Sequence, residues 1–278
     1  MSNEDLVAGI ATTLIDGVQR LIAPNAGMMT GPGTNTYLLG EKHIAVIDPG
    51  PAIDAHIDKI IEVAAAPIRW ILVTHTHPDH SPAAAILAAK TGAEVLGIPA
   101  PQGPHQDQTL VPDRRLSDKD LFSTDEFELE AVHTPGHASN HLCYLHKQSQ
   151  WLFTGDHIIN GPTVVIDPPD GSMSDYLDSL QKLKTKSIKA LVPGHGAVLE
   201  NVTEALDWLI DHRLSRESKV LRSLKTHPAT SLSELVTHVY DDVDSSLHPL
   251  AERSLLAHLL KLKIDSKAST ENNRWHPI

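Results

Sequence analysis

Seven consecutive residues of this chain concentrate metal-binding side chains: Thr74-His75-Thr76-His77-Pro78-Asp79-His80. In an extended segment, residues two apart project to the same side, so His75 and His77 can bind one ion. The helical pattern that begins after Ser81 turns the chain, which directs Asp79 and His80 toward a second position. Imidazole and carboxylate are ligands that Zn²⁺ prefers when no thiolate is available, and Fe and Mn accept the same set. The stretch therefore predicts a site for metal ions.

Three later loops offer the ligands that a pair of ions requires. His137 follows Pro135-Gly136 and can be the third imidazole of the first ion, Asp156 can bridge both ions, and His195, between two glycines, can bind the second. The predicted ligands are His75, His77, Asp79, His80, His137, Asp156 and His195. With two Zn²⁺ ions per chain and a shared water or hydroxide, each ion keeps the open position that distinguishes a catalytic site from a structural one.

Two further residues are candidates to support these ligands. A metal-bound imidazole usually donates its other N–H group to a carboxylate or a carbonyl. Asp48 lies at a predicted strand end before Pro49-Gly50, where it can accept such a bond or simply cap the turn. His141 lies close to the loop that carries His137, and it is either a support or an ordinary histidine.

The pattern along the chain favours an α/β or α+β sandwich in which helices cover the sheets. The predicted strands are 42–47, 69–74, 94–98, 126–132, 142–145, 151–153 and 189–192, and the predicted helices are 82–90, with Ser81 as N-cap, and 173–186. After residue 200 the pattern is helical, over 202–224, 231–240 and 249–263, and the polar tail 265–278 is expected to be frayed. We therefore expect a catalytic domain at 1–200 and a small helical, helix-turn-helix-like domain at 201–278.

Composition excludes several classes of protein. The chain has 278 residues, a net charge of −12 and a single cysteine, Cys143, which cannot form an internal disulfide. Its acidic start differs from a signal peptide, and no apolar run approaches the about 18 residues of a membrane span. We expect a cytoplasmic protein with no membrane segment. The negative charge also counts against nucleic-acid binding.

One predicted helix carries a band of basic residues, in contrast to the negative net charge of the chain. Arg213, Arg216, Lys219, Arg222 and Lys225 recur every three residues of a predicted helix. They form either a phosphate-binding ridge or a solvated face, and the interleaved acidic residues favour the solvated face.

In order and spacing, the ligand motifs resemble those of the metallo-β-lactamase-fold hydrolases, over about residues 20 to 200. The resemblance implies an αββα sandwich, with His75, His77 and His137 on the first metal. It implies Asp79, His80 and His195 on the second metal and Asp156 as the bridge. True β-lactamases of this fold lack a bridging Asp at the position of Asp156, so β-lactam hydrolysis is a poor interpretation.

A closer resemblance is to the β-lactamase-like protein 2 group. It depends on the Gly31–Leu38 segment, the segments 155–159 and 161–165, and the helical C-terminal part. The group implies a winged-helix-like C-terminal domain and either single-stranded-RNA endonuclease activity or hydrolysis of acyl-carrier thioesters. Glyoxalase II is similar in its seven ligands.

These observations predict a metal-dependent hydrolase. Zinc lowers the pKa of water from about 15.7 to about 7, so a hydroxide that bridges two ions is available as nucleophile, and Asp79 can orient it. A thiolate, with a pKa near about 8.5, leaves without help, whereas a ribose oxygen needs an acid, for which His157 is the nearest candidate. We therefore expect a small-molecule ester or thioester as substrate, with single-stranded RNA as the alternative. A non-catalytic metal-binding module is disfavoured, because it would not need an open position or a flexible loop at residues 31–36.

Overall fold

The computed structural model describes residues 6–278, which form two compact units. The first comprises the described residues up to Thr134, together with Asn140–Thr163 and Ser187–Val202. The second comprises Pro135–Ser139, Val164–Lys186 and Thr203–Ile278. No helix in residues 6–278 is long and apolar enough to cross a membrane.

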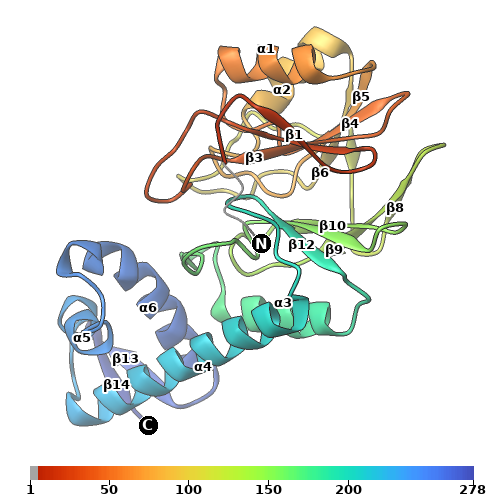
Figure 1. The fold of residues 1–278 in the computed structure, drawn as a ribbon. Coiled ribbons are helices and arrows are strands. Elements are labelled where there is room, and N and C mark those ends of the chain that lie inside the picture. Colours follow the sequence, from red (N-terminus) through yellow and green to blue (C-terminus); the bar gives the residue numbers. More distant parts are fainter. Residues whose placement is uncertain (1–5) are drawn as a thin grey trace. The chain divides into compact units, whose positions relative to one another are not determined.

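A seven-stranded sheet forms one layer of the first unit. Its strands lie in sequence order: β1 (Ala11–Ile15), β2 (Val18–Ile22), β3 (Asn35–Leu39), β4 (Ile44–Ile47), β5 (Ile68–Leu72), β6 (Glu94–Gly97) and β7 (Arg114–Arg115). Strands β1 to β4 pair antiparallel, and the pairs from β4 to β7 are parallel. Parallel neighbours need crossover connections. The helices α1 (Asp54–Val63) and α2 (Ala83–Thr91) make two of them and cover one face of this sheet (Figure 1).

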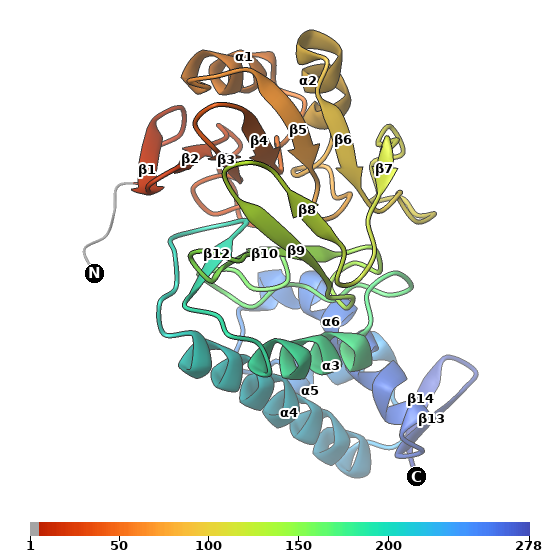
Figure 2. The same cartoon turned by 90° about the vertical axis from the view of Figure 1, so that its right-hand side faces the viewer.

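A five-stranded sheet forms the next layer, in the order β12-β11-β10-β9-β8. Its strands are β8 (Leu121–Ser123), β9 (Glu128–His133), β10 (Leu142–His146), β11 (Trp151–Gly155) and β12 (Ala190–Pro193). All neighbours are antiparallel except β11 and β12, which are parallel. The two sheets lie face to face (Figure 1, Figure 2).

Alternate residues of the central strands supply two separate cores. Ile47 and Leu72 join Tyr144 and Phe153 in the core between the sheets. The chain neighbours of Ile47 and Leu72, Val46 and Ile71, pack instead against α1 and α2. Strands buried on both faces are held firmly, so the loops that follow β4, β5, β11 and β12 start from fixed points.

The second unit is mainly helical. It contains α3 (Met173–Lys184), nearly all of α4 (Val202–Thr226), α5 (Leu232–Val239), the short η1 (Ser245–Leu247), α6 (His248–Ile264) and a hairpin of β13 (Ala268–Glu271) and β14 (Arg274–Pro277). Ser231 caps α5 in a reciprocal capping box with Glu234. One apolar cluster joins α4, α5 and α6 to Ala268 and Trp275 of the hairpin.

Two local predictions are wrong. The tail is not frayed, because Trp275 buries its indole with only 6% exposed and the turn at Asn272 and Asn273 adopts positive φ angles that close a hairpin. Ser81 is not the N-cap of α2. Pro82 occupies that position, and the Ser81 hydroxyl donates a hydrogen bond to Asp107 instead. The segments β1 to β3, α1, β7, β8, η1 and the C-terminal hairpin were not predicted, whereas the predicted elements appear with ends shifted by a few residues.

The buried hairpin predicts an unequal response of two tryptophans. We expect Trp275→Ala to lower the free energy of unfolding by about 3 kcal/mol, because it leaves a cavity in the core of the second unit. Trp208→Ala, at a site that is 53% exposed on α4, should cost less than about 1 kcal/mol. Urea unfolding followed by circular dichroism measures both. Equal losses would show that the hairpin does not contribute to this core.

Candidate metal centre

Most of the predicted ligands lie at the ends of buried strands in the first unit. Residues 74–80 follow β5, Asp156 directly follows β11, and His195 follows β12 by two residues. The strand pair β11 and β12 is parallel, so Asp156 and His195 emerge at the same edge of their sheet. Loops fixed by a buried scaffold are the usual place for chemically active groups.

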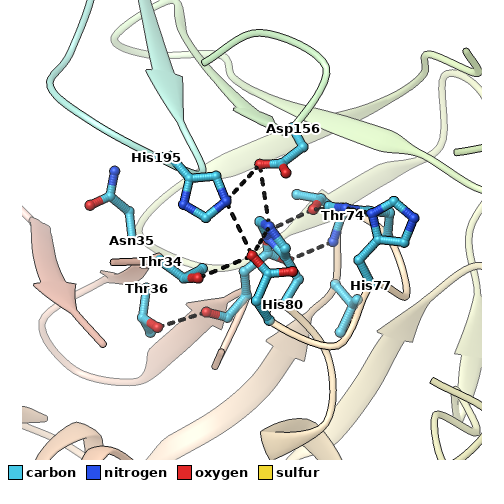
Figure 3. Close-up of polar contacts among 12 residues, drawn as sticks. Thr34, Asn35, Thr36, Thr74, His77, His80, Asp156 and His195 are labelled. Carbon is cyan, nitrogen blue, oxygen red and sulfur yellow. Dashed lines mark hydrogen bonds and ion pairs between the residues drawn. The ribbon is translucent and has the colours of Figure 1, made fainter. Parts of the chain in front are cut away.

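Four of these side chains converge on one point (Figure 3). His80 Nε2 lies 3.4 Å from Asp79 Oδ2 and 3.3 Å from Asp156 Oδ1. His195 Nε2 lies 3.2 Å and 3.3 Å from the same two oxygen atoms. When ligand atoms lie about 2.05 Å from a tetrahedral zinc ion, adjacent ligand atoms are about 3.3 Å apart. The four separations therefore fit the edges of a tetrahedral metal site.

The burial of the ring nitrogens supports the same conclusion. His80 Nε2 and His195 Nε2 are both buried, and within residues 6–278 their contacts with the carboxylates of Asp79 and Asp156 do not have the geometry of hydrogen bonds. A buried polar atom without a hydrogen bond costs free energy, and a metal ion would remove that cost. The residues present therefore fit a divalent ion.

A second group of ligand atoms consists of histidines alone. Its members in the first unit are His75 and His77, whereas His137, the predicted third ligand, lies in the second unit. His75 Nε2 lies 3.0 Å from His77 Nδ1, so the alternate spacing in the sequence does bring these two rings together. Six of the seven predicted ligands thus lie in these two groups of the first unit, and His137 belongs to the second unit.

Asp48 connects the loop after β5 to the ligand His80. Its Oδ1 accepts a bond of 2.7 Å from the Thr74 amide, and its Oδ2 accepts another of 2.7 Å from the Thr74 hydroxyl. The same Oδ2 lies 2.9 Å from His80 Nδ1, so a proton on Nδ1 leaves Nε2 as the ligand atom. Asp48 itself has a φ of 49°, and its carbonyl accepts a hydrogen bond from the Thr36 hydroxyl. It therefore both shapes the turn and orients a ligand.

The carboxylates set the protonation of the ligands in the metal-free protein. Burial alone would lower the pKa of His195, but Asp156 and Asp79 raise it to about 10. Burial would also lower the pKa of His80. The nearby carboxylates outweigh this effect and raise the pKa well above its usual value. In the other group, burial and the neighbouring His80 and His77 lower the pKa of His75 well below its usual value. His75 is thus neutral, as a metal ligand must be.

Residues that the sequence analysis did not identify as supports hold the loop of His195. The Asn35 amide donates bonds of 2.9 Å to the carbonyls of Pro193 and Gly196. A side chain at Gly194 would place its Cβ 2.7 Å from Asp156 Oδ1, so only glycine fits beside the ligands. Residues 34–36 are fully buried, so the expectation of a flexible loop is wrong for them. Polar residues at a strand start, as in Thr34-Asn35-Thr36, were the available signal.

Two other histidines lie near the ligands but belong to neither group of ligand atoms. The His141 ring stacks on His75, with centroids 5.0 Å apart, and its Nδ1 lies 3.0 Å from the Thr134 hydroxyl. His141 thus supports His75 by contact. His157 is completely buried and its ring lies 5.9 Å from that of His141. A buried ring has no access to a leaving group, which argues against His157 as the acid.

The layered fold and two groups of histidine and aspartate at strand ends define a metal-dependent hydrolase. The sequence matches the Metallo-beta-lactamase superfamily over residues 29–195 and the Beta-lactamase associated winged helix domain over residues 231–275. The chain belongs to the metallo-beta-lactamase superfamily.

Named relatives are similar over most of the chain. A Beta-lactamase-like protein 2 homolog of Caenorhabditis elegans is 32% identical, over 82% of this chain and 78% of that protein. An Atrochrysone carboxyl ACP thioesterase of Aspergillus fumigatus is also 32% identical, over 75% of this chain and 65% of that protein. A solved Beta-lactamase domain protein from Burkholderia ambifaria has the same fold, with a TM-score of 0.85 at 19% identity, over 100% of this chain and 96% of that chain. The expected fold class, with its winged-helix C-terminal domain, is confirmed.

The position of Asp48 yields a prediction for metal affinity. Asp48→Ala removes the partner of His80 Nδ1, and we expect the protein to bind zinc about 10- to 100-fold more weakly. Competition with a chromophoric chelator measures this affinity. Asp125→Ala, at an exposed position, is the matched control and should bind zinc like the unchanged protein. Equal affinities of the two variants would exclude a supporting role for Asp48.

Proposed function

We propose that this protein is a dinuclear zinc hydrolase that cleaves an ester or thioester bond of a small molecule. The observation that carries the proposal is the convergence of Asp79, His80, Asp156 and His195 at separations that suit a tetrahedral ion. Two bound zinc ions would supply Lewis acidity and a hydroxide nucleophile near neutral pH. The predicted catalytic domain at 1–200, the C-terminal domain at 201–278 and the cytoplasmic location belong to the same proposal.

The chain's own residues would divide the work as follows. His75, His77 and His137 would hold the first ion, Asp79, His80 and His195 would hold the second, and Asp156 would contribute to both. Asp79 has 25% of its side chain exposed, against 12% or less for the other three members of its group. Thr34 Oγ1 donates to Asp79 Oδ2 over 3.4 Å and so helps to fix the carboxylate. This exposure supports a role for Asp79 in orienting the attacking water from the solvent side.

The leaving group supports a thioester over RNA. A thiolate departs without a proton donor, and His157, the nearest candidate acid in the sequence, is buried. A relative that is 32% identical carries the name of an acyl carrier thioesterase. Hydrolysis of a thioester thus needs no proton donor beyond the side chains already described.

The basic band on α4 gives RNA little support. Arg213 is buried, and Arg216 pairs with Asp242 in two hydrogen bonds of 2.7 Å and 2.9 Å. Lys219 pairs with Asp241 and Asp242. Arg213, Arg216 and Lys219 are thus used within the protein, which differs from the solvated face that the sequence favoured, and Arg222 and Lys225 are the exposed members of the band.

One assay tests the proposal. The zinc-loaded protein is incubated with acyl-coenzyme A thioesters, with release of free thiol as the signal, and separately with single-stranded RNA. We expect thioester turnover that a chelator abolishes and that Asp156→Ala reduces more than about 100-fold, because this change removes a ligand rather than a support. Asp125→Ala is again the matched control.

Two outcomes would contradict the proposal. Full turnover after complete metal removal would exclude a metal-dependent reaction. Cleavage of RNA that disappears in Asp156→Ala, without any thioester turnover, would replace the thioester with RNA as substrate.

A further inference from the structure

The loop that carries His137 is fixed by other parts of the second unit. The Ser179 hydroxyl donates a bond of 2.8 Å to the Pro135 carbonyl, and the Ser172 amide donates one of 2.8 Å to the Gly136 carbonyl. Gly136 has a φ of 143°, and a Cβ there would lie 2.4 Å from Tyr176 Cα. The loop is thus packed closely against the backbone of α3, and a larger residue would push it away.

The ring of His137 takes its orientation from a backbone carbonyl. Its Nδ1 lies 2.7 Å from the Val165 oxygen, an acceptor, so Nδ1 carries the proton and donates it. The other nitrogen, Nε2, is then the atom available to a metal. The direction of this ligand therefore depends on where the Val165 carbonyl is held.

Residues on both sides of Val165 are bound by helices of the C-terminal part. The Arg213 guanidinium, on α4, donates a bond of 2.5 Å from Nη2 to the Val164 carbonyl. The Ser254 hydroxyl, on α6, accepts a bond of 3.3 Å from the Ile166 amide. Arg253, also on α6, lies 3.2 Å from Asp167. Two helices thus fix the short segment 164–167.

Arg213 is the most constrained member of this network. Only 3% of it is exposed, and its guanidinium lies over the Tyr176 ring, 5.2 Å from the centroid. Tyr176 is also the residue on which Gly136 packs. Burying a guanidinium costs free energy unless its donors are used. Arg213 therefore links the segment 164–167 and the loop of His137 to α4.

We propose that Arg213, assisted by Ser254, is a positioning residue for the metal ligand His137. The C-terminal helices would then be part of the metal-binding machinery, through the Val165 carbonyl, and not only an appended domain. The inference rests on the proposed function, because it needs His137 to bind an ion.

The test is zinc binding by the full-length chain. Arg213→Met keeps the packing on Tyr176 and removes the hydrogen bond to Val164. We expect the affinity for one of the two ions to fall about tenfold, with the other ion unchanged. Zinc stoichiometry by elemental analysis and competition with a chromophoric chelator measure this without reference to activity. Arg222→Met, at an exposed position on the same helix, should bind both ions as the unchanged protein does. Arg213→Lys, which keeps a donor, should restore part of the affinity.

A milder variant covers the case in which Arg213→Met does not fold, as judged by circular dichroism. Ser254→Ala removes one neutral hydrogen bond and should weaken the same ion about threefold.

His137→Ala separates the two levels of the argument. If it loses one zinc while Arg213→Met and Ser254→Ala bind both ions normally, the positioning role is wrong and the proposed function stands. If His137→Ala keeps two tightly bound zinc ions, the ligand assignment itself is wrong.

Discussion

The rest of the site depends on one electrostatic constraint: two carboxylates and two imidazoles are held 3.2 to 3.4 Å apart in a largely buried position. Without an ion, protons on His80 and His195 balance these carboxylates, and the raised pKa values reflect that balance. A divalent ion would supply the same positive charge and also use the ring nitrogens. Such a cluster is costly to assemble, so it exists only because buried strands and the Asp48 network fix each loop.

Much of the site could be predicted from the sequence because its ligands are local and chemically distinctive. The alternate spacing of His75 and His77 brings their nitrogens within 3.0 Å, and the loops of Asp156 and His195 meet because their strands are parallel neighbours. The central strands were also readable, since residues buried on both faces produce continuous apolar runs. These signals depend on side-chain type and short spacing, which a single sequence displays directly.

The remaining supports could not be predicted because they act across long sequence separations. Asn35 binds carbonyls near residue 195, and Arg213 binds a carbonyl near residue 164. Neither asparagine nor arginine is specific for binding distant backbone carbonyls, and an arginine within a helix rich in charges is usually solvated. The hairpin at the C-terminus was missed for a related reason. Its short strands are mostly polar, and their stability comes from Trp275 packing on helices that are distant in sequence.

These long-range contacts change how the basic residues of α4 are understood. A band with a three-residue period looks like a surface that meets phosphates, yet its members have different partners. Arg213 binds a backbone carbonyl inside the second unit, and Arg216 binds Asp242 while its guanidinium lies 4.4 Å from the centroid of the Tyr240 ring. Because a guanidinium remains charged when buried, it can bind acceptors that a neutral side chain would hold weakly. The charges on this helix therefore stabilise internal structure first, and the segment that orients His137 is one product of that arrangement.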